Sequence, residues 1–170
     1  LDTLETLVKP QRVVPTIIEF VDIAGLVKGA STGAGLGNKF LANIREVDAI
    51  VHVVRCFEDE NVVHVEGRVN PVFDKEIIDA ELQLKDLESV EKKMQRIDKA
   101  ARVGDAKARA ELETLRLFKT ALEAGKSART VNVAPEDVQA AVGDLHLLTI
   151  KPVLYVANVD EASLPDGNQY

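Results

Sequence analysis

The chain has 170 residues, enough for one domain with an insertion and a buried core. Its formal net charge of −7 argues against a protein that coats nucleic acid with its whole surface. No apolar run approaches the ~20 residues of a membrane-spanning helix. The single cysteine, Cys56, excludes an internal disulfide framework and fits a reducing compartment. We therefore expect a cytoplasmic protein with no membrane partner.

Three short runs of the chain have the composition of β-strands. Residues 13–22 and 49–55 are rich in β-branched side chains, and residues 152–158 resemble a buried strand. Between the first two runs, residues 40–45 carry apolar side chains at helical spacing. The succession of strand, loop, helix and strand predicts an α/β fold with a parallel sheet.

A helical hairpin is predicted over residues 74–124. The first helix has an apolar stripe at three-, four- and seven-residue steps, formed by Ile77, Leu84, Leu87, Met94, Ile97 and Ala101. The stripe of the second helix is Leu112, Leu115, Phe118 and Leu122. Between them, residues 103–105 (Val-Gly-Asp) supply a helix stop and a new N-cap. The two helices are therefore expected to lie antiparallel and to pack through a seam.

The hairpin interrupts the α/β pattern, which returns after a short helix predicted to begin at Pro135. We therefore predict a partial α/β core formed by residues 1–72 and 145–170. Residues 73–144 are predicted to form the α-helical insertion.

The acid at the end of the first predicted strand is a candidate magnesium residue. Open α/β sheets bind ligands at the carboxyl ends of their strands, where Asp22 lies. Mg²⁺ prefers few carboxylates together with waters and phosphate oxygens, so Asp22 is expected to hold it through a water. Gly25 leaves its N–H open to a terminal phosphate. Alone, this D-x-x-G pattern is weak, because a strand-end acid before a turn is common.

Half of the ten glycines follow Asp22 within a short segment, namely Gly25, Gly29, Gly33, Gly35 and Gly37. A loop of this composition directly after a phosphate-sensing Asp and Gly suits a nucleotide switch, which the terminal phosphate orders and hydrolysis releases. An ordinary flexible loop is the alternative interpretation.

A second polar motif, Asn158-Val159-Asp160-Glu161, ends another predicted strand. Guanine-nucleotide proteins carry N-K-x-D here, and the Asp carboxylate accepts hydrogen bonds from the guanine ring edge. Val159 replaces the Lys and Glu161 replaces the Asp. These changes are expected to weaken guanine selection. A polar exit from a strand is the alternative.

Taken together, these stretches closely resemble the Obg-like ATPase (YchF-type) family of phosphate-loop nucleotide hydrolases. The resemblance rests on residues 20–31, 35–45 and 52–57 and on the N-x-x-E motif at 158–161, and it covers nearly the whole chain. It implies a G-domain-like core, Mg²⁺-dependent hydrolysis of ATP at least as readily as GTP, ribosome association and a C-terminal TGS domain.

The sequence contains no G-x-x-x-x-G-K-[ST] phosphate loop. We therefore expect a fragment that lacks the phosphate loop and the TGS domain and is inactive alone. Gly125-Lys126-Ser127 mimics the end of such a loop, but the earlier glycine is replaced by Thr120. We interpret that segment as a helix C-terminus.

The attacking water requires a residue to orient it. Ras-type enzymes use a Gln after D-x-x-G, whereas Leu26 occupies this position. The family resemblance points instead to His64, whose imidazole can orient water or accept a proton near neutral pH. A histidine with a purely structural role is the alternative. His52 and His146 lie in apolar runs and are interpreted as structural.

The hairpin carries a concentration of positive charge. Residues 92–109 contain seven basic side chains and two acids, a local balance of 7 − 2 = +5. Lys92, Arg96 and Lys99 share one helical stripe, which is expected to meet phosphates of ribosomal RNA. A solvated helix surface is the alternative.

The predicted function is Mg²⁺-dependent nucleotide hydrolysis in a ribosome-associated switch. One alternative is a guanine-specific GTPase, which base competition separates from it. A second is a module that binds nucleotide with little turnover, which single-turnover kinetics would reveal.

Overall fold

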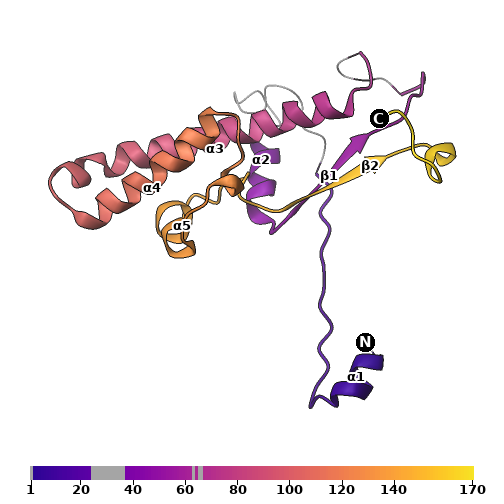
Figure 1. The fold of residues 1–170 in the computed structure, drawn as a ribbon, viewed down its shortest axis with the longest axis horizontal. Helices are drawn as coiled ribbons and strands as arrows, with labels where there is room; N and C mark the ends of the chain where they lie inside the picture. Colours follow the sequence, from indigo (N-terminus) through magenta and orange to yellow (C-terminus); the bar gives the residue numbers. More distant parts are fainter. Residues whose placement is uncertain (1, 24–36, 63, 65–66) are drawn as a thin grey trace.

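The computed structural model describes residues 2–23, 37–62, 64 and 67–170. A long helical hairpin occupies one end, a small sheet the other, and the N-terminal segment leaves the sheet region as an extended trace (Figure 1). The elements are α1 (Asp2–Val8), α2 (Gly37–Glu46), β1 (Ile50–Arg55), α3 (Pro71–Arg102), α4 (Ala106–Glu123), α5 (Pro135–Val142) and β2 (Val153–Asn158). The described residues also include the 3₁₀ turns η2 (Ala128–Thr130) and η3 (Glu161–Ser163).

The sheet in the described part of the chain consists of β1 and β2, which run parallel. The register pairs Ile50 with Val153 and Arg55 with Asn158, so both strands end at the same edge. This edge is called the carboxyl edge below. The predictions of strands at residues 49–55 and 152–158, and of a parallel sheet, are confirmed.

The predicted strand at residues 13–22 is wrong. These residues are extended but form no ladder, and Ile17 and Phe20 are 88% and 80% exposed. β-propensity measures how well a side chain fits a pleated, half-buried surface, and it creates no strand without a hydrogen-bonded neighbour. Among the described residues, β1 and β2 pair only with each other, so this segment has no such neighbour.

The hairpin and α5 enclose the larger hydrophobic core. Its buried residues are Val90, Leu115, Phe118, Leu122, Ala128, Ala141, Val142 and Leu147. Asp105 caps α4 by accepting a hydrogen bond from the Ala108 amide at 3.0 Å. Gly104, with φ of 105°, makes the turn before it. The predicted helix stop, N-cap and α4 stripe are therefore confirmed, and α5 begins at Pro135 as expected.

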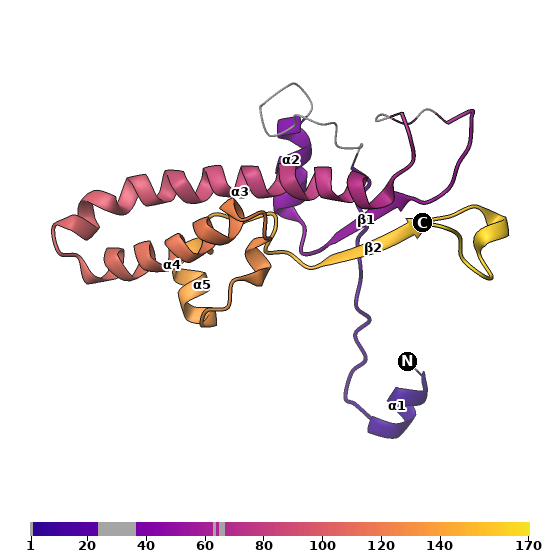
Figure 2. The same cartoon turned by 45° about the horizontal axis from the view of Figure 1, so that its top comes forward.

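The apolar stripe predicted for α3 is only partly correct. Leu84 is 55% exposed, whereas Leu82 and Val90 are buried. The reason is that α3 runs the length of the molecule and changes partner on the way (Figures 1 and 2). Its first half packs against α2 through Leu82, Leu41 and Ile44, and its second half packs against α4. An apolar stripe on one fixed side of α3 cannot face both α2 and α4.

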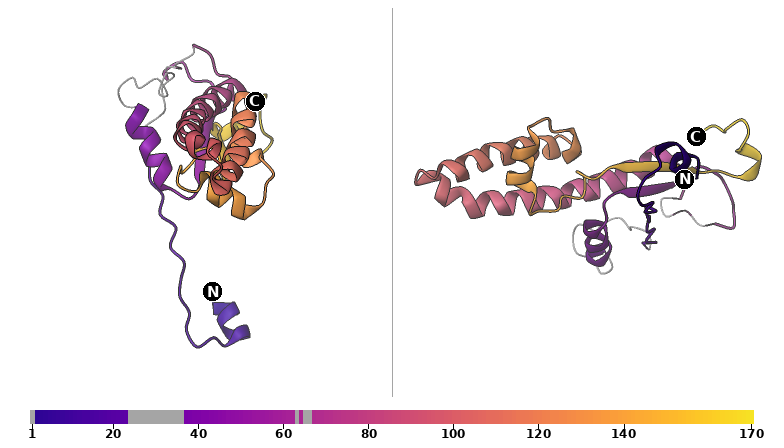
Figure 3. Two further views of the ribbon diagram at one scale, coloured as in Figure 1. Left: turned by 90° about the vertical axis from the view of Figure 1, so that its left-hand side faces the viewer. Right: turned by 90° about the horizontal axis from the view of Figure 1, so that it is seen from below.

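Viewed along the hairpin, α3, α4 and α5 cluster together while α2 stands to one side (Figure 3). A buried carboxylate of α3 links the hairpin to the loop that enters β2. Asp86 of α3 accepts hydrogen bonds from the amides of Leu148 and Thr149 at 2.7 Å each, and from the Thr149 hydroxyl at 2.7 Å. Burial raises the pKa of Asp86, and these hydrogen bonds oppose the rise. The loop entering β2 is thereby fixed to the hairpin.

None of the described helices is long and apolar enough to cross a lipid bilayer.

Candidate nucleotide-binding site

The N-x-x-E motif lies at the carboxyl edge of the sheet. Asn158 is the last residue of β2, and its carbonyl accepts a hydrogen bond from the Cys56 amide at 2.8 Å. Asp160 caps η3 by accepting from the Ser163 amide at 2.8 Å. The side chains of Asn158 and Glu161 are exposed, and Val159 is half-buried. The motif therefore offers one amide and one carboxylate to a ligand on a backbone held by the strand and the cap.

A hollow of about 350 Å³ adjoins this motif, lined by Phe57, Glu58, Asp160, Asn168, Gln169 and Tyr170. Two hydrogen bonds hold its wall: the Asn168 amide donates to the Cys56 carbonyl at 2.7 Å, and the Tyr170 hydroxyl donates to Glu58 at 2.6 Å. The bond to Glu58 raises the pKa of Tyr170. The hollow places carboxylate oxygens beside the N-x-x-E motif, where a donor such as an exocyclic amine can bind.

Arg55, at the end of β1, orders the loop that follows the strand. Its guanidinium donates to the carbonyls of Phe57 and Val62 at 2.9 Å each and of Asp59 at 3.3 Å. It also lies 4.7 Å from the centre of the Phe57 ring. Arg55 was not among the residues expected at the site. Its only signal was a basic residue in place of an apolar one at a strand end.

His64 lies on the connection from β1 to α3 and contacts a residue that the sequence analysis also missed. Its Nε2 is 2.9 Å from Oδ2 of Asp74, with side-chain exposures of 15% and 23%. Asp74 occupies the first turn of α3, after the N-cap Asn70 and Pro71. The Asn-Pro pair followed by an acid signals a helix start, but nothing in the sequence indicates the contact with His64.

The candidate magnesium residue is exposed. Among the described residues, no hydrogen bond or ion pair joins Asp22 to Asn158 or Glu161, so the structure shows no direct contact between the candidate magnesium residue and the N-x-x-E motif. Gly25 lies outside the described residues. A single exposed carboxylate fits an ion that keeps most of its waters. No group of three or more metal-binding side chains occurs among the described residues.

His52 contrasts with His64. Its ring lies 5.6 Å from that of Tyr155, and burial lowers its pKa. Such a packed, neutral ring suits the structural role expected for it. Gly125, with φ of 69°, follows the end of α4, in agreement with the interpretation of residues 125–127 as a helix C-terminus.

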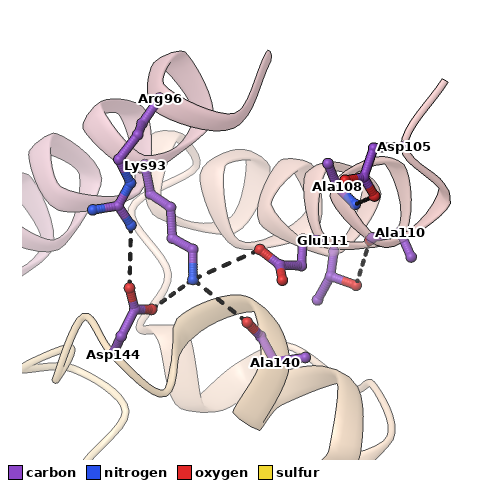
Figure 4. Close-up of polar contacts among 9 residues, drawn as sticks. Lys93, Arg96, Asp105, Ala108, Ala110, Glu111, Ala140 and Asp144 are labelled. Atoms are coloured by element: carbon purple, nitrogen blue, oxygen red, sulfur yellow. Dashed lines mark hydrogen bonds and ion pairs between the residues drawn. The ribbon is translucent and has the colours of Figure 1, made fainter. Parts of the chain in front are cut away.

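The basic residues of the hairpin fall into two groups. Lys93 is buried, and its Nζ contacts Oδ1 of Asp144 at 2.5 Å, the Ala140 carbonyl at 3.4 Å and Glu111 at 3.9 Å (Figure 4). Arg96 meets the same Asp144 at 3.2 Å. This network connects α3, α4 and the end of α5, and it is structural.

The predicted RNA-facing stripe remains on the surface, although two of its three members have acidic partners. Lys92 pairs with Glu88, and Arg96 pairs with Asp144. Lys85 and Lys92 lower the pKa of Glu88 to about 2. Lys99 is exposed, and no ion pair to it is found among the described residues.

Comparisons with known proteins agree with this geometry. The model of a family described as 50S ribosome-binding GTPase matches residues 3–103. The ribosome-binding ATPase YchF of Bacillus subtilis is 54% identical over 99% of the chain, and that of Escherichia coli O157:H7 is 53% identical over all of it. The solved structure of the Schizosaccharomyces pombe YchF GTPase matches with a TM-score of 0.77 and 40% identity over 99% of the chain.

The parallel strand pair, the polar carboxyl edge and this structural match define the class as a G-domain-like nucleotide-hydrolase fold with a helical hairpin. The chain spans 46% of the length of each of these relatives. It belongs to the 50S ribosome-binding GTPase family and, within it, to the YchF-type (Obg-like) ATPases, as the sequence resemblance predicted.

Proposed function

We propose that this chain is the base-binding and switch-bearing part of a Mg²⁺-dependent nucleotide hydrolase that accepts ATP at least as well as GTP. The observation that carries the proposal is the N-x-x-E motif at the carboxyl edge of a parallel strand pair, beside a polar hollow. The bacterial relatives are named ribosome-binding ATPases, and the fission-yeast structure is named a GTPase. These names support nucleotide hydrolysis but do not agree on the base, so the preference for adenine or guanine is argued from the residues of the site.

The base is selected by Asn158, Val159 and Glu161. A short Asp at the end of N-K-x-D reaches the guanine ring nitrogen and amino group together, an arrangement that adenine cannot match. Glu161 is one methylene longer, which moves its carboxylate relative to that edge. Val159 removes the lysine stem that packs across a guanine base. Asn158 serves either purine, and the nearby carboxylates can accept from the amine of adenine.

A second set of residues is proposed to contact the phosphates. Asp22 would hold Mg²⁺ through a water, and Gly25 would contact the terminal phosphate. When bound, the ion supplies positive charge that offsets the charge developing on the phosphoryl oxygens. His64 orients the attacking water, the role that Leu26 cannot perform.

The hairpin supplies the contact with the ribosome. Lys92, Arg96 and Lys99 are exposed along one side of α3, where ribosomal RNA phosphates can approach them. The bacterial relatives are named ribosome-binding ATPases, which supports this assignment. The proposed division of labour follows the predicted domains: residues 1–72 and 145–170 bind nucleotide, and residues 73–144 bind the ribosome.

Turnover in a full-length family member carrying this segment tests the proposal. ATP hydrolysis should require Mg²⁺, stop with EDTA and persist against an equal concentration of GTP. The isolated chain should not hydrolyse ATP, because its sequence contains no phosphate loop. Strong inhibition of ATP turnover by GTP would favour the guanine-specific alternative. Tight binding without turnover would favour the binding module.

A further inference from the structure

The contact between His64 and Asp74 places a carboxylate directly against the candidate catalytic imidazole. Their Nε2 and Oδ2 atoms lie 2.9 Å apart, a hydrogen-bond distance, in a partly buried setting. We propose that Asp74 is a positioning residue that fixes the place and the tautomer of the His64 ring for its action on water. The inference rests on the role proposed above for His64.

Asp74 itself is held by a rigid element. Its amide donates to the Asn70 carbonyl at 2.9 Å, and Asn70 also caps the helix by accepting from the Phe73 amide at 3.1 Å. About one and two turns later, Ile78 and Leu82 anchor the same helix in the core shared with α2. The Asp74 carboxylate is thus part of a fixed helical turn, whereas His64 lies on a loop. A group on a rigid element is suited to orienting a group on a loop.

The chemistry of the pair determines which ring nitrogen does what. An ionised carboxylate only accepts hydrogen bonds, so the neutral imidazole must donate from Nε2. Nδ1 is then the ring nitrogen that carries the lone pair. If the ring takes a proton during the reaction, the adjacent carboxylate stabilises the resulting imidazolium. Asp74 therefore favours one tautomer at rest and the protonated ring in the transition state, the two effects by which a carboxylate supports a catalytic histidine.

A purely structural account of the same contact exists. An acid in the first turn of a helix interacts favourably with the helix dipole, and a His–Asp contact ties a loop to that helix. Both effects act on folding stability. They predict no specific loss of turnover at temperatures where the protein is fully folded, and this difference separates the two accounts.

The test uses a full-length family member carrying this segment and four forms of it: wild type, His64→Ala, Asp74→Asn and the double variant. ATP turnover is measured at saturating Mg-ATP, together with nucleotide affinity and thermal unfolding. Asp74→Asn should lower kcat about 10- to 100-fold, the range for removing a group that orients a functional histidine, with ATP affinity retained. In the His64→Ala background the second substitution should change kcat less than about twofold, because Asp74 acts through the ring. Asp79→Asn, one turn further along α3 in an ion pair with Lys75, is the matched control and should keep wild-type turnover.

The outcomes separate this inference from the proposed function. If His64→Ala lowers kcat and Asp74→Asn does not, the positioning role of Asp74 is overturned, while the proposed role of His64 stands. If His64→Ala leaves kcat unchanged, the proposed role of His64 is overturned, and this inference is overturned with it. An equal loss from Asp74→Asn with and without His64 shows that Asp74 acts elsewhere and overturns the inference.

A measurement on the wild type alone covers the case in which Asp74→Asn fails to fold. The ¹⁵N shifts of the His64 ring should report Nε2 as the protonated nitrogen of the neutral ring. Protonation at Nδ1, or an even mixture, overturns the inference.

Discussion

The hairpin and the carboxyl edge of the sheet differ in how their polar groups are used. In the hairpin, Lys93 is buried and compensated by acids, and Phe118 and Leu115 are almost fully enclosed. At the edge, Asn158 and Glu161 are exposed on a backbone that a strand and a capped turn hold in place. The hairpin therefore provides the rigidity of the molecule, while the edge keeps its polar atoms open for a ligand.

Asp86 joins the hairpin to the loop that enters β2, and its removal should have the largest effect. Asp86→Ala leaves two amides and one hydroxyl without their buried acceptor. We expect a loss of about 3–5 kcal/mol in the free energy of unfolding, from several buried donors left unsatisfied at once. Asp98→Ala, on the same helix but half-exposed beside Arg102, should cost less than about 1 kcal/mol. Urea unfolding measures both. Equal losses in the free energy of unfolding would mean that Asp86 does not connect the hairpin to the loop that enters β2 as described.

The buried ion pair of the hairpin should come next. Asp144→Ala leaves the enclosed Lys93 ammonium with only the more distant Glu111 and the Ala140 carbonyl. The expected cost is about 2–3 kcal/mol, less than for a fully isolated buried charge. Glu88→Ala instead removes the half-exposed acid that Lys85 and Lys92 share, and it should cost less than about 1 kcal/mol. If Asp144→Ala cost no more unfolding free energy than Glu88→Ala, the Lys93 network would contribute no more to stability than an ordinary surface ion pair.

At the carboxyl edge, base choice should change without a change in stability. Val159→Lys with Glu161→Asp restores the usual guanine-reading side chains and should move the preference toward GTP by about 1–3 kcal/mol, the scale of one buried polar group left unpaired. Competition binding of the two nucleotides measures the shift, and the unfolding free energy serves as the control. If the preference between ATP and GTP did not change, the N-x-x-E motif would have no role in base selection.

The smallest effect is expected for a surface charge of the hairpin. Lys99→Glu should weaken ribosome or RNA association and reduce its salt slope by about one, as for the loss of one phosphate contact. Reversing Lys92 and Arg96 as well should weaken it further, but it also breaks their pairs with Glu88 and Asp144. Lys126→Glu, an equal charge change beyond the end of α4, should have little effect. Binding that tolerates all three reversals would identify the stripe as solvated surface.

Local signals in the sequence predicted the parts of the fold that depend on local chemistry. Residue types at fixed spacings account for four features: the Asp105 cap, the Gly104 turn, the apolar stripe of α4, and the strands that precede and follow the hairpin in the chain. The strand expected at residues 13–22 was wrong because a strand also requires a partner, which composition does not specify. The stripe on α3 was partly wrong because that helix changes partner along its length.

The candidate site divides in the same way. The N-x-x-E motif could be placed at a strand end from its sequence alone. The contacts of Asp74 with His64, and of Asp86 with the loop before β2, join residues 10 and more than 60 positions apart. Neither contact follows from periodicity or from a motif, because each depends on how α3 is docked. These side chains could therefore be recognised only from the structure.

The most direct test of the nucleotide assignment compares two dissociation constants. The Kd values of ATP and GTP would be measured side by side, with Mg²⁺, on an otherwise unmodified full-length family member carrying this segment. The account predicts that ATP binds at least as tightly as GTP, because Glu161 and Val159 replace the residues that select guanine. A preference for GTP greater than about tenfold, roughly 1.4 kcal/mol, would contradict it.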